Sequence, residues 1–136
     1  MFFHVNLVAV LVTAVAIFVL GWLWYSPLLF FNPWMRLRGL DPAAAMANAK
    51  MPMGKLGIEF ARCFILAYVV AGIVTHGEPT VFGAAHIGLI LWIGFPVILL
   101  TGSVIWDNVP WKVAAIHAGD WLVKLLVIAL IASVWH

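Results

Sequence analysis

Three ionisable side chains lie close together within a long apolar run near the C-terminus. His117, Asp120 and Lys124 interrupt the run from Val113 to Trp135, which is long enough to cross a bilayer. At about 100° per residue in an α-helix, positions 117, 120 and 124 fall within an arc of about 60°. An isolated Asp or Lys near the bilayer centre costs roughly 2.5–3.5 kcal/mol. The pattern therefore predicts that this helix face turns away from lipid, towards other helices, a water-filled cavity or another subunit.

A second pair of charges, Glu59 and Arg62, lies in the first two turns of another apolar run. With a rise of ~1.5 Å per residue, these two side chains lie roughly 5 and 9 Å inside one membrane boundary. His117 and Asp120 lie roughly 9 and 14 Å inside the same boundary. The similar depths predict an intramembrane network of these four residues, with Lys124 reaching it or pairing with Asp120 at i,i+4.

Such a network has several interpretations. The charge pairs can fix how the helices pack, or they can relay a proton or ion, or bind a charged substrate. Arg62 can also extend to the lipid headgroups, which would leave no network. An enzyme acting on lipid through Glu59, His117 and Asp120 is a further alternative. Because no serine has an obvious base partner and no phosphate-binding loop is present, a role as an enzyme is the less favoured interpretation.

Other histidines lie near the opposite membrane boundary. His4, His76 and His86, with Glu78 close to His76, are candidate zinc or copper ligands. Their spacings match no metal signature, so we predict no metal and no other cofactor. A haem cannot bridge His86 and His117, because they lie roughly 20 Å apart along the membrane normal. A haem between His4 and His86 is compatible with their depths.

The composition excludes a soluble globular domain. Of the 136 residues, 66% are hydrophobic and 9% are charged, which is typical of a polytopic membrane protein forming a single membrane domain. The net charge of +2 rests on seven basic residues, most of them between two apolar runs, and gives no basic face for nucleic acid. Cys63 is the only cysteine, so an intrachain disulfide is excluded.

Four apolar runs predict four membrane-spanning helices, at about residues 3–25, 56–75, 81–106 and 113–135. Short connections make neighbouring helices antiparallel, so the predicted fold is all-α, an integral membrane four-helix bundle. Aromatic residues, including Tyr25 and Trp34, cluster where the first run ends, as is typical of a membrane–water boundary.

The segment between the first and second runs sets the predicted orientation. It holds four of the seven basic residues, namely Arg36, Arg38, Lys50 and Lys55. Under the positive-inside rule this segment is cytoplasmic, which places both termini outside. Asp41 followed by Pro42 predicts the start of a short cytoplasmic interfacial helix that extends to about Lys50.

A Trp-Tyr-Ser-Pro motif lies within the segment Gly21–Phe30 and is followed by Asn32–Met35. These residues resemble a bacterial membrane protein family catalogued as domain of unknown function 1761. The resemblance continues through Gly88–Phe95 and Ala118–Trp135, and so covers nearly the full chain. It implies four membrane helices and a bacterial membrane setting, and it brings no activity or functional residues. The fourth span of that family is usually less charged than the one in this chain.

These observations favour a small transporter or channel-like protein of the bacterial inner membrane that moves a proton, an ion or a small solute. Four helices leave little room for both packing and a conduit, which favours a homo-oligomer. The alternative is a structural or accessory membrane protein whose buried charges only fix helix packing. The expected partners are the lipid bilayer and further copies of the chain, and the sequence does not identify the substrate.

Overall fold

The computed structural model describes residues 4–48, 53–77 and 80–136, and the regular structure in these ranges is helical. The long helices are α1 (Leu7–Trp24), α4 (Met53–His76), α5 (Val81–Trp92) continued through the π-helix η1 (Ile93–Val97) into α6 (Ile98–Trp106), and α7 (Trp111–Val134). Two short helices, α2 (Phe31–Leu37) and α3 (Pro42–Ala47), follow α1. Within these ranges, four stretches are long and apolar enough to cross a membrane: α1, α4, the third span Val81–Trp106, and α7.

Polar side chains determine where several helices begin. The side-chain oxygen of Asn6 accepts hydrogen bonds from two backbone N–H groups in the first turn of α1. Thr80 caps α5 in the same way, and Asp41 caps α3 with Pro42 in the first turn, as the sequence predicts. These caps satisfy N–H groups that the helix itself leaves unbonded. Helix α3 ends at Ala47 with Asn48 as its C-cap, before the predicted end at about Lys50, and residues 49–50 lie outside the described residues.

The third span contains an irregular turn at Pro96. Proline has no N–H to donate, and its ring clashes with the preceding turn of a regular α-helix. The helix widens here into the π-helix η1, with Pro96 buried inside it. A π-turn of this kind lets the span continue across the proline.

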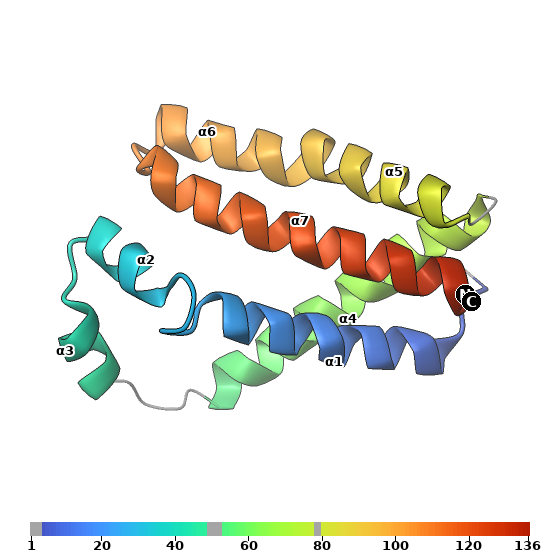
Figure 1. Ribbon diagram of the computed structural model, residues 1–136, viewed down its shortest axis with the longest axis horizontal. Helices are drawn as coiled ribbons and strands as arrows, with labels where there is room; N and C mark the ends of the chain where they lie inside the picture. Colours follow the sequence, from blue (N-terminus) through green and yellow to red (C-terminus); the bar gives the residue numbers. More distant parts are fainter. Residues whose placement is uncertain (1–3, 49–52, 78–79) are drawn as a thin grey trace.

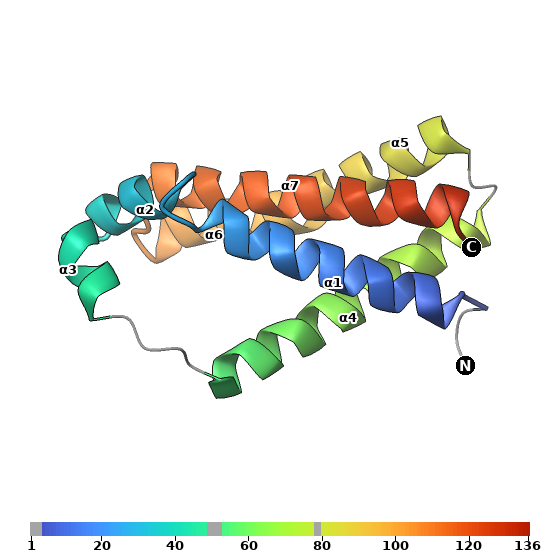
Figure 2. The ribbon, with the colours of Figure 1, turned by 60° about the horizontal axis from the view of Figure 1, so that its bottom comes forward.

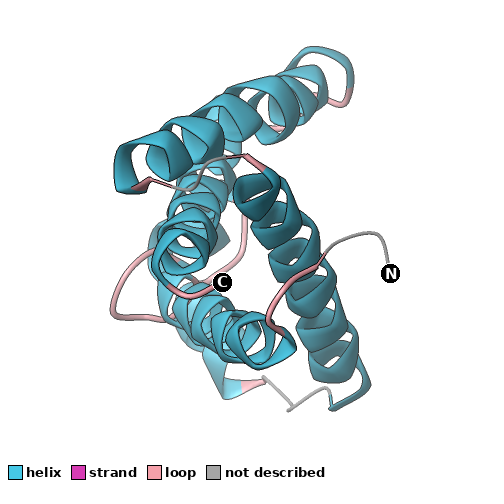
Figure 3. Cartoon of the chain, turned by 90° about the vertical axis from the view of Figure 1, so that its right-hand side faces the viewer, coloured by secondary structure: helices cyan, strands magenta, loops and turns pink. Residues whose placement is uncertain are grey.

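Helix α7 lies at the centre of the molecule. It contacts α1 and α4 on one side and the third span on the other, as Figure 1 and the end view of Figure 3 show. Helix α4 also packs on α1 and crosses it obliquely (Figure 2). The start of α1 and the end of α7 line one small cavity, so both lie at the same end of the bundle. We call this the terminal end, and the opposite end, where α2 and α3 lie, the α2 end (Figure 1).

The apolar core lies mainly between α1, α4 and α7. Its largest fully buried side chains are Val10, Ile17, Val74 and Ile128. The third span contributes less to this core. In its most apolar stretch 11% of the residues are buried, against 28–33% in the corresponding stretches of the other three spans. Most of its apolar side chains therefore face outwards, as expected for a helix that meets lipid or another membrane protein.

Two glycines allow other elements to approach α7 closely. A Cβ atom at Gly88 would lie 3.3 Å from the carbonyl oxygen of Leu125, so α5 packs directly on the α7 backbone. A Cβ atom at Gly119 would lie 2.6 Å from Cζ2 of Trp24. Small residues at such contacts are typical of helix packing in membranes.

We predict that Gly119→Ala destabilises the protein by about 1–3 kcal/mol relative to Gly102→Ala, because the added methyl group overlaps the Trp24 ring. Gly102 is a matched control, since it is also helical and a Cβ atom there meets nothing within 4 Å. Unfolding in detergent, followed by tryptophan fluorescence, measures the difference. Equal stability of the two variants would contradict the close packing of Trp24 on α7.

Candidate functional site

The site is built around a buried ion pair on α7. Nζ of Lys124 lies 3.0 Å from Oδ2 of Asp120, and the two side chains are 11% and 8% exposed. Opposite them lies Gly21 of α1, where an added Cβ atom would lie 3.1 Å from the Lys124 nitrogen. Because Gly21 has no side chain, α1 leaves room for the ammonium group. The charged face of α7 therefore points into the bundle of its own chain and not towards lipid.

The pairing has a local and a non-local cause. Asp120 and Lys124 are four residues apart, so one helix turn already brings their side chains together. Packing of α1 and α4 against α7 then removes both groups from solvent. Removing one partner of a buried pair leaves an uncompensated charge and costs about 3–5 kcal/mol. The two charges are therefore strongly coupled to each other.

Tyr25 extends the polar contacts from this pair towards the α2 end. It lies just beyond Trp24, the last residue of α1, and its Oη is 2.6 Å from Nδ1 of His117. Burial, followed by interaction with the Asp120 carboxylate, raises the pKa of Tyr25. The Tyr25 hydroxyl is thus hydrogen-bonded to His117 and lies within the electrostatic influence of Asp120. We call His117, Tyr25, Asp120 and Lys124 together the polar chain.

Aromatic side chains from α2 cover the polar chain at the α2 end. The Trp34 ring lies 4.9 Å from the Tyr25 ring and 6.0 Å from the His117 ring, between centroids. Arg38 stacks on the Trp34 ring, with its guanidinium carbon 5.3 Å from the ring centroid. Helix α2 thus places Trp34 against the polar chain, and Arg38, which follows α2, stacks on that tryptophan.

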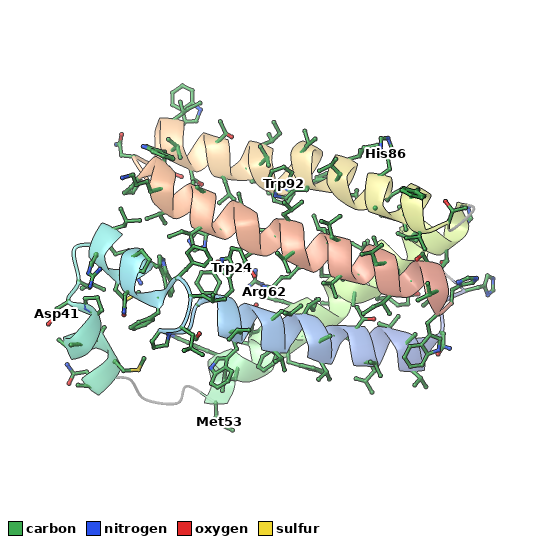
Figure 4. All side chains as sticks on the ribbon, viewed as in Figure 1. Trp24, Asp41, Met53, Arg62, His86 and Trp92 are labelled. Carbon is green, nitrogen blue, oxygen red and sulfur yellow. The ribbon has the colours of Figure 1, made fainter. Side chains whose placement is uncertain are left out.

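Two further tryptophans hold α7 in place beside the polar chain. Nε1 of Trp24 donates to the carbonyl oxygen of Ile116 over 3.0 Å, and Nε1 of Trp92 donates to that of Ala118 over 2.8 Å. Figure 4 shows Trp24 and Trp92 on opposite sides of α7. Because their indole N–H groups are bonded to the α7 backbone, both rings have a fixed position. These contacts set the rotation of α7, and hence the direction in which Asp120 points.

Glu59 and Arg62, also predicted to join the network, form an ion pair with each other on α4. Their side chains are 39% and 61% exposed, and in the described residues neither forms an ion pair with Asp120 or Lys124. The structure therefore shows two separate ion pairs, and a direct link between them stays a prediction.

The histidines considered as metal ligands are not brought together in the described residues. His4, His76 and His86 are exposed, and His86 points away from α7 in Figure 4. Over residues 4–48, 53–77 and 80–136, no group of three potential ligands from His, Cys, Asp and Glu lies close enough to hold a metal ion. Glu78, considered with these histidines, lies outside the described residues.

Sequence reasoning missed the partners of the charged face. It interpreted Tyr25 and Trp34 as part of a boundary cluster of aromatic residues, whereas the structure places both against His117. The sequence did contain one indication that Tyr25 lies against the charged face of α7. Gly21 and Tyr25 are four residues apart, so they share a helix face at a depth that matches the charged face of α7. Helix α2, which supplies Trp34, was not predicted.

The polar chain occupies one half of the bundle. It begins near Trp34 at the α2 end and reaches Lys124, close to the middle of α7. Beyond Lys124, α7 buries Leu125, Ile128 and Ala129 against the other helices of the core. Groups that can exchange a proton therefore extend inwards from the α2 end, and an apolar layer separates them from the terminal end.

Comparison with known proteins identifies a family and no characterised relative. A family model described as "Protein of unknown function (DUF1761)" matches residues 8–133, which include the polar chain and nearly all of the four long helices. Neither a curated protein nor a solved structure matches the chain. The chain belongs to the DUF1761 family of proteins of unknown function.

Proposed function

We propose that the protein is a small membrane carrier that moves a proton, or a small charged solute coupled to a proton. The main support for the proposal is the Asp120–Lys124 ion pair, which is buried in the middle of a membrane-spanning helix. Tyr25 interacts with Asp120 and is hydrogen-bonded to His117, so it connects the pair to that histidine. Ionisable residues inside membrane spans are costly, and they commonly mark ion pathways and proton relays. In this proposal Asp120 and Lys124 form the binding site, and Tyr25 and His117 connect it to the α2 end.

The distribution of basic residues supports an orientation. Arg36, Arg38, Lys55 and Lys112 lie in or beside the connections at the α2 end, and the described residues beyond the spans at the terminal end include no Lys or Arg. The positive-inside rule then places the α2 end in the cytoplasm and both termini outside. The polar chain accordingly lies in the cytoplasmic half of the bundle. The proposed location is the bacterial inner membrane.

The coupling mechanism follows from the charges of the pair. A proton that arrives through His117 and Tyr25 neutralises the Asp120 carboxylate. Lys124 then carries a buried charge without a counter-ion, which is an unfavourable state. The helices relieve this state by rearranging so that the ammonium group, or a solute anion bound to it, reaches the terminal end. The apolar layer beyond Lys124 separates the two sides until that rearrangement occurs.

An alternative function is a structural or accessory role without transport. In the described residues every buried side-chain nitrogen and oxygen atom has a hydrogen-bond partner. A fully satisfied pair can fix the register of helices without ever changing its protonation. A homo-oligomer is compatible with both functions, and the outward-facing apolar surface of the third span supports it. The polar chain lies within one subunit, so a pathway between subunits is not required.

We predict that Asp120→Asn combined with Lys124→Met abolishes proton flux into proteoliposomes, measured with a trapped pH-sensitive dye under a membrane potential. Each single variant should lose about 3–5 kcal/mol of stability, because one charge stays buried without a partner. The double variant should regain most of this stability, since it buries neither charge.

The matched control is Glu59→Gln combined with Arg62→Met, which removes an exposed ion pair of the same type. Each of its single variants should change stability by about 1 kcal/mol or less. Flux that persists in the folded Asp120/Lys124 double variant would show that this pair is not the transport site, and absence of flux in the wild-type protein would reject the carrier and favour the structural role.

We predict that Tyr25→Phe lowers proton flux several-fold, because it removes the hydroxyl group between His117 and Asp120. The loss of one hydrogen bond should cost about 0.5–1.5 kcal/mol of stability. Stopped-flow dye measurements on proteoliposomes, combined with thermal unfolding, separate the two effects. A variant with reduced stability and unchanged flux would show that Tyr25 only supports packing.

A further inference from the structure

A groove lies between α2 and α3, apart from the polar chain. Its volume is about 310 Å³, and its lining consists of Pro27, Phe31, Asn32, Arg36, Asp41, Pro42, Ala43 and Met46. This volume is at the lower end of the range for small-molecule sites.

The turn between α2 and α3 produces this groove. Gly39 has a φ of 76°, the left-handed conformation that glycine adopts easily. The N–H groups of Gly39 and Leu40 donate to the carbonyl oxygens of Arg36 and Met35, which is the hydrogen-bond pattern of a glycine-ended helix. The chain therefore turns sharply after α2, and α3 packs against α2 (Figure 1).

The groove lies where a bilayer meets water. Helix α1 ends at Trp24, and α2 and α3 follow it outside the long apolar spans. Trp106 and Trp111, which flank the connection between α6 and α7 at the same end, are both exposed. Exposed tryptophans are enriched at the level of the lipid headgroups. A ligand of this groove is therefore within reach of the membrane surface.

The groove carries one positive and one negative charge. Arg36 is exposed and forms no ion pair within the part of the chain that the structure describes. Asp41 uses one carboxylate oxygen to cap α3, accepting from Ala43 N over 3.3 Å, and its other oxygen is available. Figure 4 shows Asp41 at the outer edge of the molecule, where the chain enters α3. The lining thus offers a donor for an anion, an acceptor for a cation, and apolar side chains such as Phe31 and Met46.

We infer that this groove binds the headgroup of a membrane phospholipid that carries a primary ammonium group beyond its phosphate, as phosphatidylethanolamine does. Arg36, assisted by Asn32, binds the phosphate, and Asp41 accepts hydrogen bonds from the ammonium group. The apolar lining residues contact the part of the lipid next to the headgroup. This inference does not depend on the proposed transport activity.

The charges determine which lipid fits best. A quaternary choline group has no N–H to donate to Asp41, so a choline headgroup loses that contact. A glycerol headgroup leaves a net negative lipid beside the Asp41 carboxylate, which repels it. A headgroup with a phosphate and a primary ammonium satisfies both charged side chains. Hydrogen bonds to charged groups are among the stronger ones, so the expected preference over choline is about tenfold.

Native mass spectrometry of the full-length protein, in detergent with equal amounts of the ethanolamine, choline and glycerol phospholipids, tests this inference. Wild-type protein should retain the ethanolamine lipid about tenfold more than the choline lipid. Arg36→Gln should lower retention of all three lipids. Asp41→Asn should abolish the preference for ethanolamine and increase retention of the glycerol lipid, because the repelling charge is removed.

The controls separate binding from folding. Asn caps helices as well as Asp does, so Asp41→Asn should unfold at the same temperature as wild type. Arg38→Gln removes an exposed arginine of α2 that stacks on Trp34 and does not line the groove, and it should leave lipid retention unchanged. Equal retention of the three lipids by wild type would overturn the inference. An unchanged preference in Asp41→Asn, or equal effects of Arg38→Gln and Arg36→Gln, would also overturn it.

Discussion

The cost of placing charge in a membrane interior constrains this structure more than any other interaction. Asp120 and Lys124 can occupy the middle of α7 only if each neutralises the other and both are kept from lipid. Their spacing on one helix meets the first condition. The second requires a neighbouring helix that comes close without filling the space, and α1 meets it with glycine at position 21.

The surrounding contacts follow from that requirement. Trp24 packs on Gly119 and donates to Ile116, while Trp92 donates to α7 from the other side. Both tryptophans act on the half of α7 that carries the charges, where rotation of the helix would expose the pair. The other half packs mainly through small and branched apolar residues. The bundle therefore combines a polar half, held by specific hydrogen bonds, with an apolar half that separates this site from the terminal end.

Much of the fold could be predicted from the sequence, because hydrophobic length and helix periodicity are local properties. The four long apolar helices and the grouping of His117, Asp120 and Lys124 on one face follow from them. The contact between Tyr25 and His117 joins residues 92 positions apart, and it depends on how α1 and α7 cross. Depth alone likewise predicts Glu59 near Asp120. In the structure Glu59 pairs with Arg62, three residues further along α4, and a direct link to Asp120 stays a prediction.

A distance measurement in a bilayer tests the central claim most directly. Rotational-echo double-resonance NMR of protein labelled with ¹³Cγ-aspartate and ¹⁵Nζ-lysine detects close Asp–Lys pairs, and the described residues contain one such ion pair, Asp120 with Lys124. One aspartate signal should show the strong dephasing expected of a 3.0 Å contact between oxygen and nitrogen. Diluting labelled chains with unlabelled chains should leave that dephasing unchanged. Absence of dephasing, or its loss on dilution, would show that the two charges are not paired within one chain.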